Sequence, residues 1–457
     1  MEHETFKNQK FLNLIRAVPE FLLCIAVLTS LGWIAYRFYN DGYLPQPFLF
    51  IPNDTLMDWF NPGFWSKRSG IYDVWKSVYP PLSFALLDIF TLDKCYASGS
   101  PPARDCDWYA HIIIMLSYVS CVVLAWMAFH KNDPKTSLFR GLAFGLGFPL
   151  LFTLERGNLL LLALPIFILA HGPLTIPAFM RHICIGATVN IKPYLIVPVL
   201  AAGLKRQWRF AEIAAISTVI IYLLSLAYVG EGTPAQIAKN TSDFLQFAAS
   251  EAFGQMYYAT SYSPFLGIDA SGFPIRQFIG SRTLDAIAYW IPIAITSSII
   301  VSSLALASCW LQPNAVPKFR IATILILVYL IYQSPGGYAF IFPTFLVFLE
   351  KWDRPGPIIA IISCYILMLS FDYILAPVGS FYEISWLSGY GVRNSFGVSV
   401  GQFLRPGLAI IILWALCFDT ITQVIRAHKR YMPNLGLAAQ TTPALGYIPQ
   451  TEKNSNI

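Results

Sequence analysis

Two carboxylates in a polar stretch near the start of the chain are the residues best suited to acid–base chemistry. Asp54 and Asp58 are four positions apart, so a helical turn would place both on one face. Asp58 has the apolar neighbours Met57, Trp59 and Phe60, and a partly desolvated carboxylate can act as a general base. The alternative is an interfacial aspartate without a catalytic role. We predict that Asp58 is the base and that Asp54 binds substrate.

A second polar stretch, Glu155-Arg156-Gly157-Asn158, interrupts two apolar runs. Ionisable groups at membrane depth are costly, and for that reason they are candidates for function. Asn158 can hydrogen-bond a hydroxyl or a phosphate. The alternative is that Glu155 and Arg156 neutralise each other at a tight turn. We predict that Glu155, Arg156 and Asn158 bind substrate.

Lys192 lies in the sequence Asn190-Ile191-Lys192-Pro193-Tyr194, between two apolar runs that are each short for a membrane span. Pro193 breaks a helix and disfavours helical geometry in the residue before it. Broken helices at membrane depth are tolerated where they line a cavity. Lys192 would present a point charge to an anionic group such as a lipid phosphate. The alternative is that Lys192 snorkels to the interface.

The cysteines differ in their surroundings. Six of the eight lie in apolar segments, whereas Cys95 and Cys106 lie in one polar loop. A disulfide between them would suit an oxidising compartment, and two free thiols are the alternative. No Cys-x-x-Cys, His-Glu-x-x-His or Walker motif is present, so we expect neither a metal ion nor a cofactor.

The composition indicates a membrane protein. Of 457 residues, 56% are hydrophobic and only 12% are charged, whereas soluble chains carry about 25% charged residues. We predict an all-α polytopic membrane protein. The net charge of +6 is typical of basic cytoplasmic connectors and does not call for a nucleic-acid partner. The apolar stretch 12–38 is long for a signal peptide and reads as a retained first span.

The apolar segments predict about twelve transmembrane helices, although several are shorter than the roughly 20 residues that a full span needs. A further apolar segment, 81–92, reads as an interfacial or re-entrant helix. The predicted cores are 14–38, 109–130, 140–154, 157–171, 178–190, 193–204, 211–230, 285–309, 320–333, 337–350, 357–376 and 403–424.

The distribution of Lys and Arg predicts the orientation, because basic residues concentrate in cytoplasmic connectors. Both termini are expected in the cytoplasm, with the long loops 39–108, 231–284 and 377–402 outside and carrying short interfacial helices. We expect a multi-pass protein of the bacterial inner (plasma) membrane. Residues 1–430 would form one integral membrane domain, and the polar segment 431–457 would be a disordered cytoplasmic tail.

Four stretches, taken in order, resemble the GT-C class of membrane glycosyltransferases, and family 87 most closely. The first runs from the loop with Asp58 through Gly70-x-Tyr72-Asp73 to Tyr79-Pro80-Pro81-Leu82. The others are Arg156-Gly157-Asn158-Leu-Leu-Leu, Ile191-Lys192-Pro193-Tyr194, and Ser334-Pro335 ahead of Phe342-Pro343. Together they span roughly residues 55–345.

The resemblance implies a GT-C-like fold, an outward-facing cavity and an inverting transfer of mannose or another hexose. The donor would be a polyprenyl-phosphate-linked sugar, and the acceptor a lipid-linked or polysaccharide glycan, both held among membrane lipid. Asp58 matches the family's acidic residue in the first outer loop, and Tyr79 and Ser334 belong to the matching motifs. Relatives often carry His shortly after the Ser-Pro pair, whereas this chain reads Ser334-Pro335-Gly336-Gly337-Tyr338.

Two other readings fit parts of the sequence. A polysaccharide polymerase of the O-antigen type would also have many spans and large outer loops, and it would act through Arg residues of the later loops without Asp58. A secondary transporter would suit the broken helices in the middle of the chain. The long outer loops and the lack of a visible internal repeat favour the glycosyltransferase.

Overall fold

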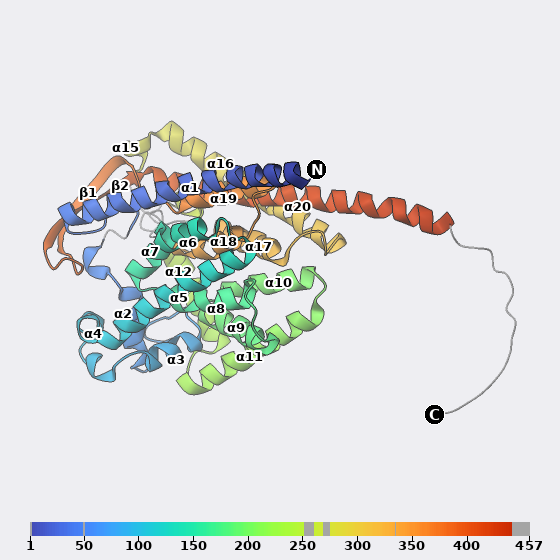
Figure 1. Cartoon of the computed structure of the whole chain (residues 1–457). Helices are drawn as coiled ribbons and strands as arrows, with labels where there is room; N and C mark the ends of the chain where they lie inside the picture. The colour runs from blue at the N-terminus through green and yellow to red at the C-terminus, as the bar shows by residue number, and fades with distance from the viewer. Residues whose placement is uncertain (1, 49–50, 251–259, 268–274, 334, 441–457) are drawn as a thin grey trace, which may run out of the picture.

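The computed structural model describes residues 2–48, 51–250, 260–267, 275–333 and 335–440, and this part of the chain is mostly helical (Figure 1). The first half of the chain forms α1 (Glu2–Asp41), η1 (Pro52–Asp54), α2 (Met57–Ser66), α3 (Pro81–Ile89), η2 (Asp93–Cys95), α4 (Ser100–Cys106), α5 (Trp108–Asn132), α6 (Ser137–Leu146), α7 (Phe148–Arg156), α8 (Leu160–His171), α9 (Ala178–Ile191), η3 (Pro193–Ile196), α10 (Val197–Leu204) and α11 (Trp208–Val229).

The second half adds helices and one pair of strands. They are α12 (Pro234–Ser250), α14 (Ser263–Gly267), α15 (Ile275–Ile279), α16 (Ser281–Leu311), α17 (Lys318–Gln333), η4 (Gly337–Phe340), α18 (Ile341–Val347), α19 (Pro355–Leu367), β1 (Ile374–Ile384), β2 (Gly391–Ser399) and α20 (Val400–Gln440). Helix α20 packs against α16, α17 and α19, and α5 packs against α6 and α8.

The prediction of about twelve spans is wrong. Within the described residues, six helical segments are long and apolar enough to cross a membrane: Ala17–Asp41, Trp108–Asn132, Ser137–Arg156, Trp208–Val229, Ser281–Leu311 and Val400–Lys429. The other predicted cores form shorter helices, such as α8 with 12 residues and α19 with 13. Most of their side chains are buried within the bundle. A helix buried inside protein is as apolar as a span, so apolar runs alone overcount the spans.

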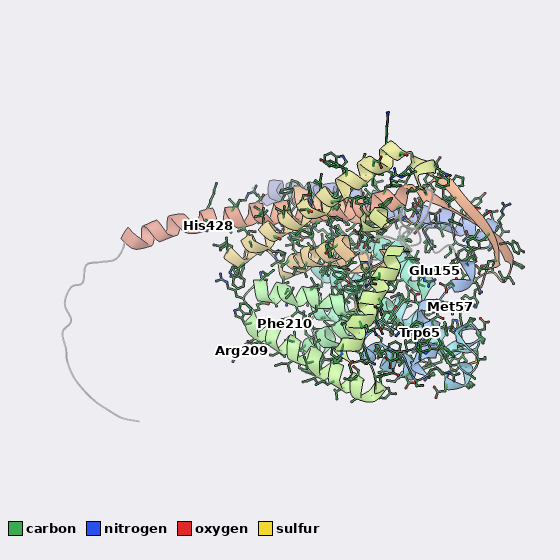
Figure 2. All side chains as sticks on the ribbon, turned by 180° about the vertical axis from the view of Figure 1, so that it is seen from behind. Met57, Trp65, Glu155, Arg209, Phe210 and His428 are labelled. Atoms are coloured by element: carbon green, nitrogen blue, oxygen red, sulfur yellow. A yellow bond between two sulfur atoms is a disulfide. The ribbon has the colours of Figure 1, made fainter. Side chains whose placement is uncertain are left out.

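The two ends of the bundle differ in character. In Figure 1 the N-terminus and the far end of α20 lie at one end, whereas α2, α4, β1 and β2 lie at the other. Figure 2 places Arg209, Phe210 and His428 toward the end with the termini, and Met57, Trp65 and Glu155 toward the opposite end. The carboxylate-rich first loop is therefore separated from the basic connectors by the length of the bundle.

The third predicted loop contains the one pair of strands in the described part of this mostly helical chain. β1 and β2 form a two-stranded antiparallel sheet that pairs Ile384 with Gly391 and Ile374 with Ser399. The register shifts twice near Ile374 and Pro377, which disrupts the alternation that identifies a strand in sequence. The side-chain amide of Gln46 exchanges two hydrogen bonds with the backbone of Gly397, at 2.9 and 3.0 Å, and so ties the hairpin to the first loop.

Buried ion pairs join helices that are distant in sequence. Arg140 donates to both carboxylate oxygens of Glu20 at 2.6 and 2.7 Å, and both side chains are almost fully buried. Arg320 pairs with Glu350 and with Asp419 in a second buried cluster. Paired charges are the form in which ionisable groups are tolerated at such depth.

The first loop is cross-linked. Cys95 and Cys106 form a disulfide with their Cα atoms 5.5 Å apart. Asp107 follows at once, and its carboxylate accepts the N–H of Ala110, which caps the start of α5. At the other end of the chain, α20 continues through 431–440, a part of the segment predicted to be disordered, and 441–457 lie outside the described residues.

Candidate functional site

The start of α2, which carries Asp58, is fixed to the end of α7. Leu56 precedes α2 in a left-handed conformation with φ 63°, and its N–H donates to the carbonyl of Glu155 at 2.8 Å. A left-handed conformation is strained for a bulky residue and persists only where the surroundings enforce it. The backbone around Asp58 is therefore set by a contact with a segment about a hundred residues later.

Gly157 allows the close approach of these two segments. The N–H of Gly157 donates to Leu154 and that of Asn158 to Thr153, at 2.9 and 3.0 Å, which is the Schellman arrangement of a helix end. Gly157 adopts φ 61°, and a Cβ atom there would lie 2.9 Å from the carbonyl oxygen of Leu56. This geometry turns the side chains of Arg156 and Asn158 toward Asp58.

Both oxygens of the Asp58 carboxylate are hydrogen-bonded. Arg156 Nη2 donates to Oδ1 at 2.6 Å, and Asn158 Nδ2 donates to Oδ2 at 2.7 Å. The other terminal nitrogen of Arg156 contacts Asp54, with 2.8 Å to Oδ2 and 2.9 Å to the backbone oxygen. A carboxylate has about four lone-pair sites, so Asp58 keeps capacity for a further donor.

Lys192 and Tyr79 form the second part of the site. Lys192 is extended, with φ −137° and ψ 106°, as expected before a proline, and its Nζ lies 4.3 Å from the centre of the Tyr79 ring. Pro81 begins α3, where its fixed φ suits the first helical position. Ser83 Oγ donates to the carbonyl of Ile191 at 3.3 Å, which anchors α3 beside Lys192.

Burial shifts the pKa values of several side chains of the site. Burial raises the pKa of Asp54, and the guanidinium of Arg156 opposes that shift. Burial lowers the pKa of Lys192 to about 8, and the Asp58 carboxylate opposes it. Burial and then the charge of Asp58 raise the pKa of Tyr79. Because Asp58 influences both Lys192 and Tyr79, the two parts of the site share one electrostatic environment.

The structure brings together six of the predicted residues, Asp54, Asp58, Tyr79, Arg156, Asn158 and Lys192, from four separate stretches of chain. Asp54, Asp58, Arg156 and Asn158 make one hydrogen-bonded cluster, and Lys192 lies close enough to respond to the charge of Asp58. Asp54 and Asp58 belong to different elements, η1 and α2, so they do not share one helical face as the spacing predicted. The guanidinium of Arg156 contacts both carboxylates.

One predicted residue, Glu155, has its partner outside this cluster, and one is not described. Arg156 does not pair with its neighbour Glu155, because its guanidinium contacts the two aspartates. The carboxylate of Glu155 accepts from the hydroxyl of Tyr43 at 2.8 Å. Tyr43 was missed by the sequence interpretation, since nothing in its surroundings signals a partner 112 positions away. Ser334 lies outside the described residues.

The arrangement offers a carboxylate held in place by two hydrogen-bond donors, and a nearby amine that forms no ion pair with a carboxylate within the described part of the chain. No group of three His, Cys, Asp or Glu side chains that could hold a metal ion occurs among the residues described. Comparison with known protein families, curated proteins and solved structures finds no match. The function is therefore argued from the geometry and the motifs.

Proposed function

We propose that the chain is an inverting membrane glycosyltransferase that moves a hexose from a polyprenyl-phosphate donor to a lipid-linked or polysaccharide acceptor at the outer face of the membrane. One observation carries the proposal. Asp58, Arg156 and Asn158 form a hydrogen-bonded cluster, and Lys192 lies within its electrostatic reach. These residues lie in three of the motifs that carry the resemblance, although they are spread over more than 130 positions.

In this proposal Asp58 accepts the proton of the acceptor hydroxyl as that oxygen bonds to the anomeric carbon. The bond between the anomeric carbon and the donor phosphate oxygen breaks, and polyprenyl phosphate leaves with the bonding electrons. A phosphate leaving group needs cationic stabilisation more than protonation. Arg156 is occupied by two carboxylates, so Lys192 is the group assigned to the phosphate. Arg156 and Asn158 position the base.

The glycan that depends on this protein provides the cellular test. Cells that lack the protein are expected to accumulate a lipid-linked or surface glycan shorter by a hexose, and mass spectrometry of the extracted glycans measures the difference. Complementation with wild-type protein restores the sugar. Unchanged glycans in the deletion strain would count against the proposal.

Orientation follows from the same proposal, because polyprenyl-phosphate chemistry at the outer face requires the first loop outside. In a background without other accessible cysteines, Ser98→Cys is expected to react with a membrane-impermeant thiol reagent in intact cells. Arg209→Cys, at the opposite end of the bundle, is expected to react only after permeabilisation. The reverse pattern would place Asp58 on the cytoplasmic side and overturn the orientation.

A pH dependence follows from Lys192. Its pKa of about 8 in the folded protein means that the cation is present below pH 8 and lost as the pH rises through that value. We expect kcat/KM for the donor to fall above about pH 8. Lys192→Arg is expected to remove that fall, because Arg stays charged. Lys94→Arg, an exposed control, is expected to keep it. If kcat/KM still falls above pH 8 in Lys192→Arg, the charge of Lys192 does not act on the donor phosphate.

A further inference from the structure

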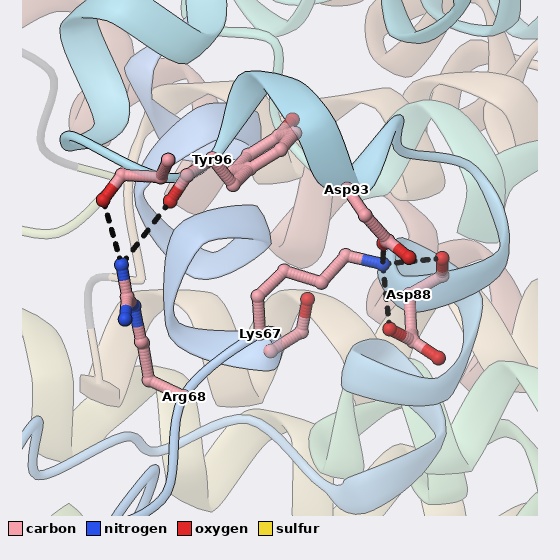
Figure 3. Close-up of a pocket in the computed structure, with 7 residues that line it drawn as sticks. Lys67, Arg68, Asp88, Asp93 and Tyr96 are labelled. Carbon is pink, nitrogen blue, oxygen red and sulfur yellow. Dashed lines mark hydrogen bonds and ion pairs between the residues drawn. The ribbon is translucent and has the colours of Figure 1, made fainter.

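A polar cavity of about 600 Å³ opens at the C-terminal end of α2. Figure 3 shows the side chains of Lys67, Arg68, Asp88, Asp93 and Tyr96 around it. A second cavity of about 420 Å³ shares Ser66, Arg68 and Asp88 with the first and adds Tyr228 and Glu231. We call the two cavities together the α2 groove. The resemblance assigns no residue of this groove a role.

The lining of the α2 groove is held in a fixed arrangement. Lys67 Nζ contacts Asp88 Oδ1 at 2.7 Å, the Asp88 carbonyl at 2.9 Å and Asp93 Oδ1 at 2.5 Å. The second carboxylate oxygen of Asp88 accepts from the hydroxyl of Tyr228 at 2.6 Å. The Cys95–Cys106 disulfide closes the loop that supplies Tyr96 and Ala97, and Asp93 lies two residues before Cys95. A ligand would meet preorganised groups, which lowers the entropic cost of binding.

The charges of the groove indicate an uncharged ligand. In the first cavity, the cations Lys67 and Arg68 are balanced by Asp88 and Asp93, and Lys67 is fully engaged with these carboxylates. The second cavity adds the carboxylate of Glu231, which accepts the backbone N–H groups of Gly70 and Tyr72. A phosphate or a uronate would find no uncompensated cation there apart from Arg68. Arg68 is exposed and donates through Nη2 to the backbone oxygens of Ala97 and Tyr96, at 2.8 and 3.4 Å. Carboxylates, carbonyls and a guanidinium facing solvent suit the hydroxyl groups of neutral sugars.

The position of the groove relative to Asp58 sets the size of the ligand. Asp58 lies in the first turn of α2, and Ser66 is its last residue. Eight residues of helix correspond to about 12 Å, which is longer than one hexose ring. Trp65, next to Ser66, stacks on the partly exposed Trp75 with ring centres 5.9 Å apart, so an aromatic surface lies along the same helix.

We propose that the α2 groove binds a neutral acceptor oligosaccharide, several hexose units long, whose reactive end reaches Asp58. This inference rests on the proposed function for the identity of the reactive end. The sugar unit next to Asp58 receives the new hexose, and the units behind it lie along α2 against Arg68, Asp88 and Asp93. The groove would make the enzyme select acceptors by length.

Binding can be measured without catalysis. Saturation-transfer NMR of purified protein in nanodiscs would use mannotriose, maltotriose and galactotriose, each beside its monosaccharide and without donor. At least one trisaccharide is expected to receive saturation from the wild type and at least tenfold less from Arg68→Ala, since a lost hydrogen bond to a charged group is worth about tenfold or more. Arg282→Ala, which removes another exposed arginine in the first turn of α16, is the matched control and is expected to bind like the wild type.

Kinetics then test selection by length. With the polyprenyl-phosphate donor, Arg68→Ala is expected to raise the KM of the bound trisaccharide about tenfold, with little change in kcat and a smaller change for the monosaccharide. If none of the trisaccharides binds the wild type, or if Arg68→Ala binds them equally, the groove is not an acceptor site. If a trisaccharide binds at the groove but no transfer occurs, the groove stands and the proposed function fails. If transfer occurs but the wild type and Arg68→Ala have equal KM values for the trisaccharide, the groove is not an acceptor site and the proposed function stands.

Discussion

Replacing Asp58 by Asn is expected to lower the rate of sugar transfer by about 10²–10⁴-fold, the usual contribution of a positioned base. Asn keeps the shape of Asp and can still accept one hydrogen bond, but it cannot take a proton from the acceptor hydroxyl. The loss is expected in kcat, because the proton moves in the transition state. Initial rates with purified protein, polyprenyl-phosphate hexose and the native acceptor measure the effect.

Asp54→Asn is the matched control for the Asp58 variant. Asp54 shares the guanidinium of Arg156 with Asp58, whereas the side-chain amide of Asn158 donates to Asp58. We expect Asp54→Asn to cost far less activity, because Arg156 and Asn158 can still hold the Asp58 carboxylate. Equal thermal unfolding of the two variants would show that both are folded. Near-normal turnover in a folded Asp58→Asn protein would contradict the assignment of Asp58 as base.

Replacing Arg140 by Met is expected to lower the stability of the protein by about 3–5 kcal/mol, the usual result of removing one partner from a buried ion pair. Glu20 would be left as a buried charge, because its carboxylate is held by Arg140 and by the hydroxyl of Tyr365. Arg140 also donates to the backbone oxygens of Phe348 and Glu350, at 2.5 and 2.8 Å. Unfolding in detergent micelles, followed by circular dichroism, measures the loss.

The double variant Glu20→Leu with Arg140→Met separates charge from packing. Removing both partners of a buried ion pair is often far less costly than removing one. We therefore expect the double variant to be more stable than Arg140→Met alone. A single variant as stable as the wild type would mean that the Glu20–Arg140 pair does not hold α1 to α6.

The sequence was sufficient to single out the polar residues of the site but not their partners. Asp58, Arg156, Asn158 and Lys192 stand out because each interrupts an apolar run or has apolar neighbours. The sequence offers Glu155 as the nearest carboxylate that could pair with Arg156, whereas the folded chain pairs Arg156 with Asp54 and Asp58 about a hundred positions earlier. Such pairing depends on the left-handed turn at Leu56 and on Gly157, and neither conformation can be read from residue types alone.

The fold was predictable at the level of helices and membrane character, but not at the level of individual spans. Long runs such as 108–132 form spanning-length helices, because their length and composition are unambiguous. Short runs such as 157–171 form helices that are buried in the bundle. They are apolar because they lie in the protein interior. The α2 groove was invisible in the sequence, because Lys67, Asp88 and Asp93 converge only after α2, α3 and the disulfide loop pack together.

The most direct test of the central claim is the fate of a labelled donor in vesicles that contain only the purified protein. With a radiolabelled polyprenyl-phosphate hexose and an acceptor glycan, we predict that the labelled hexose becomes covalently joined to the acceptor with inverted anomeric configuration. One polyprenyl phosphate would be released for each sugar transferred. Movement of the intact labelled donor across the bilayer without transfer would identify a transporter. Joining of whole glycan chains that is unaffected by Asp58→Asn would identify a polymerase, and either result would contradict the account.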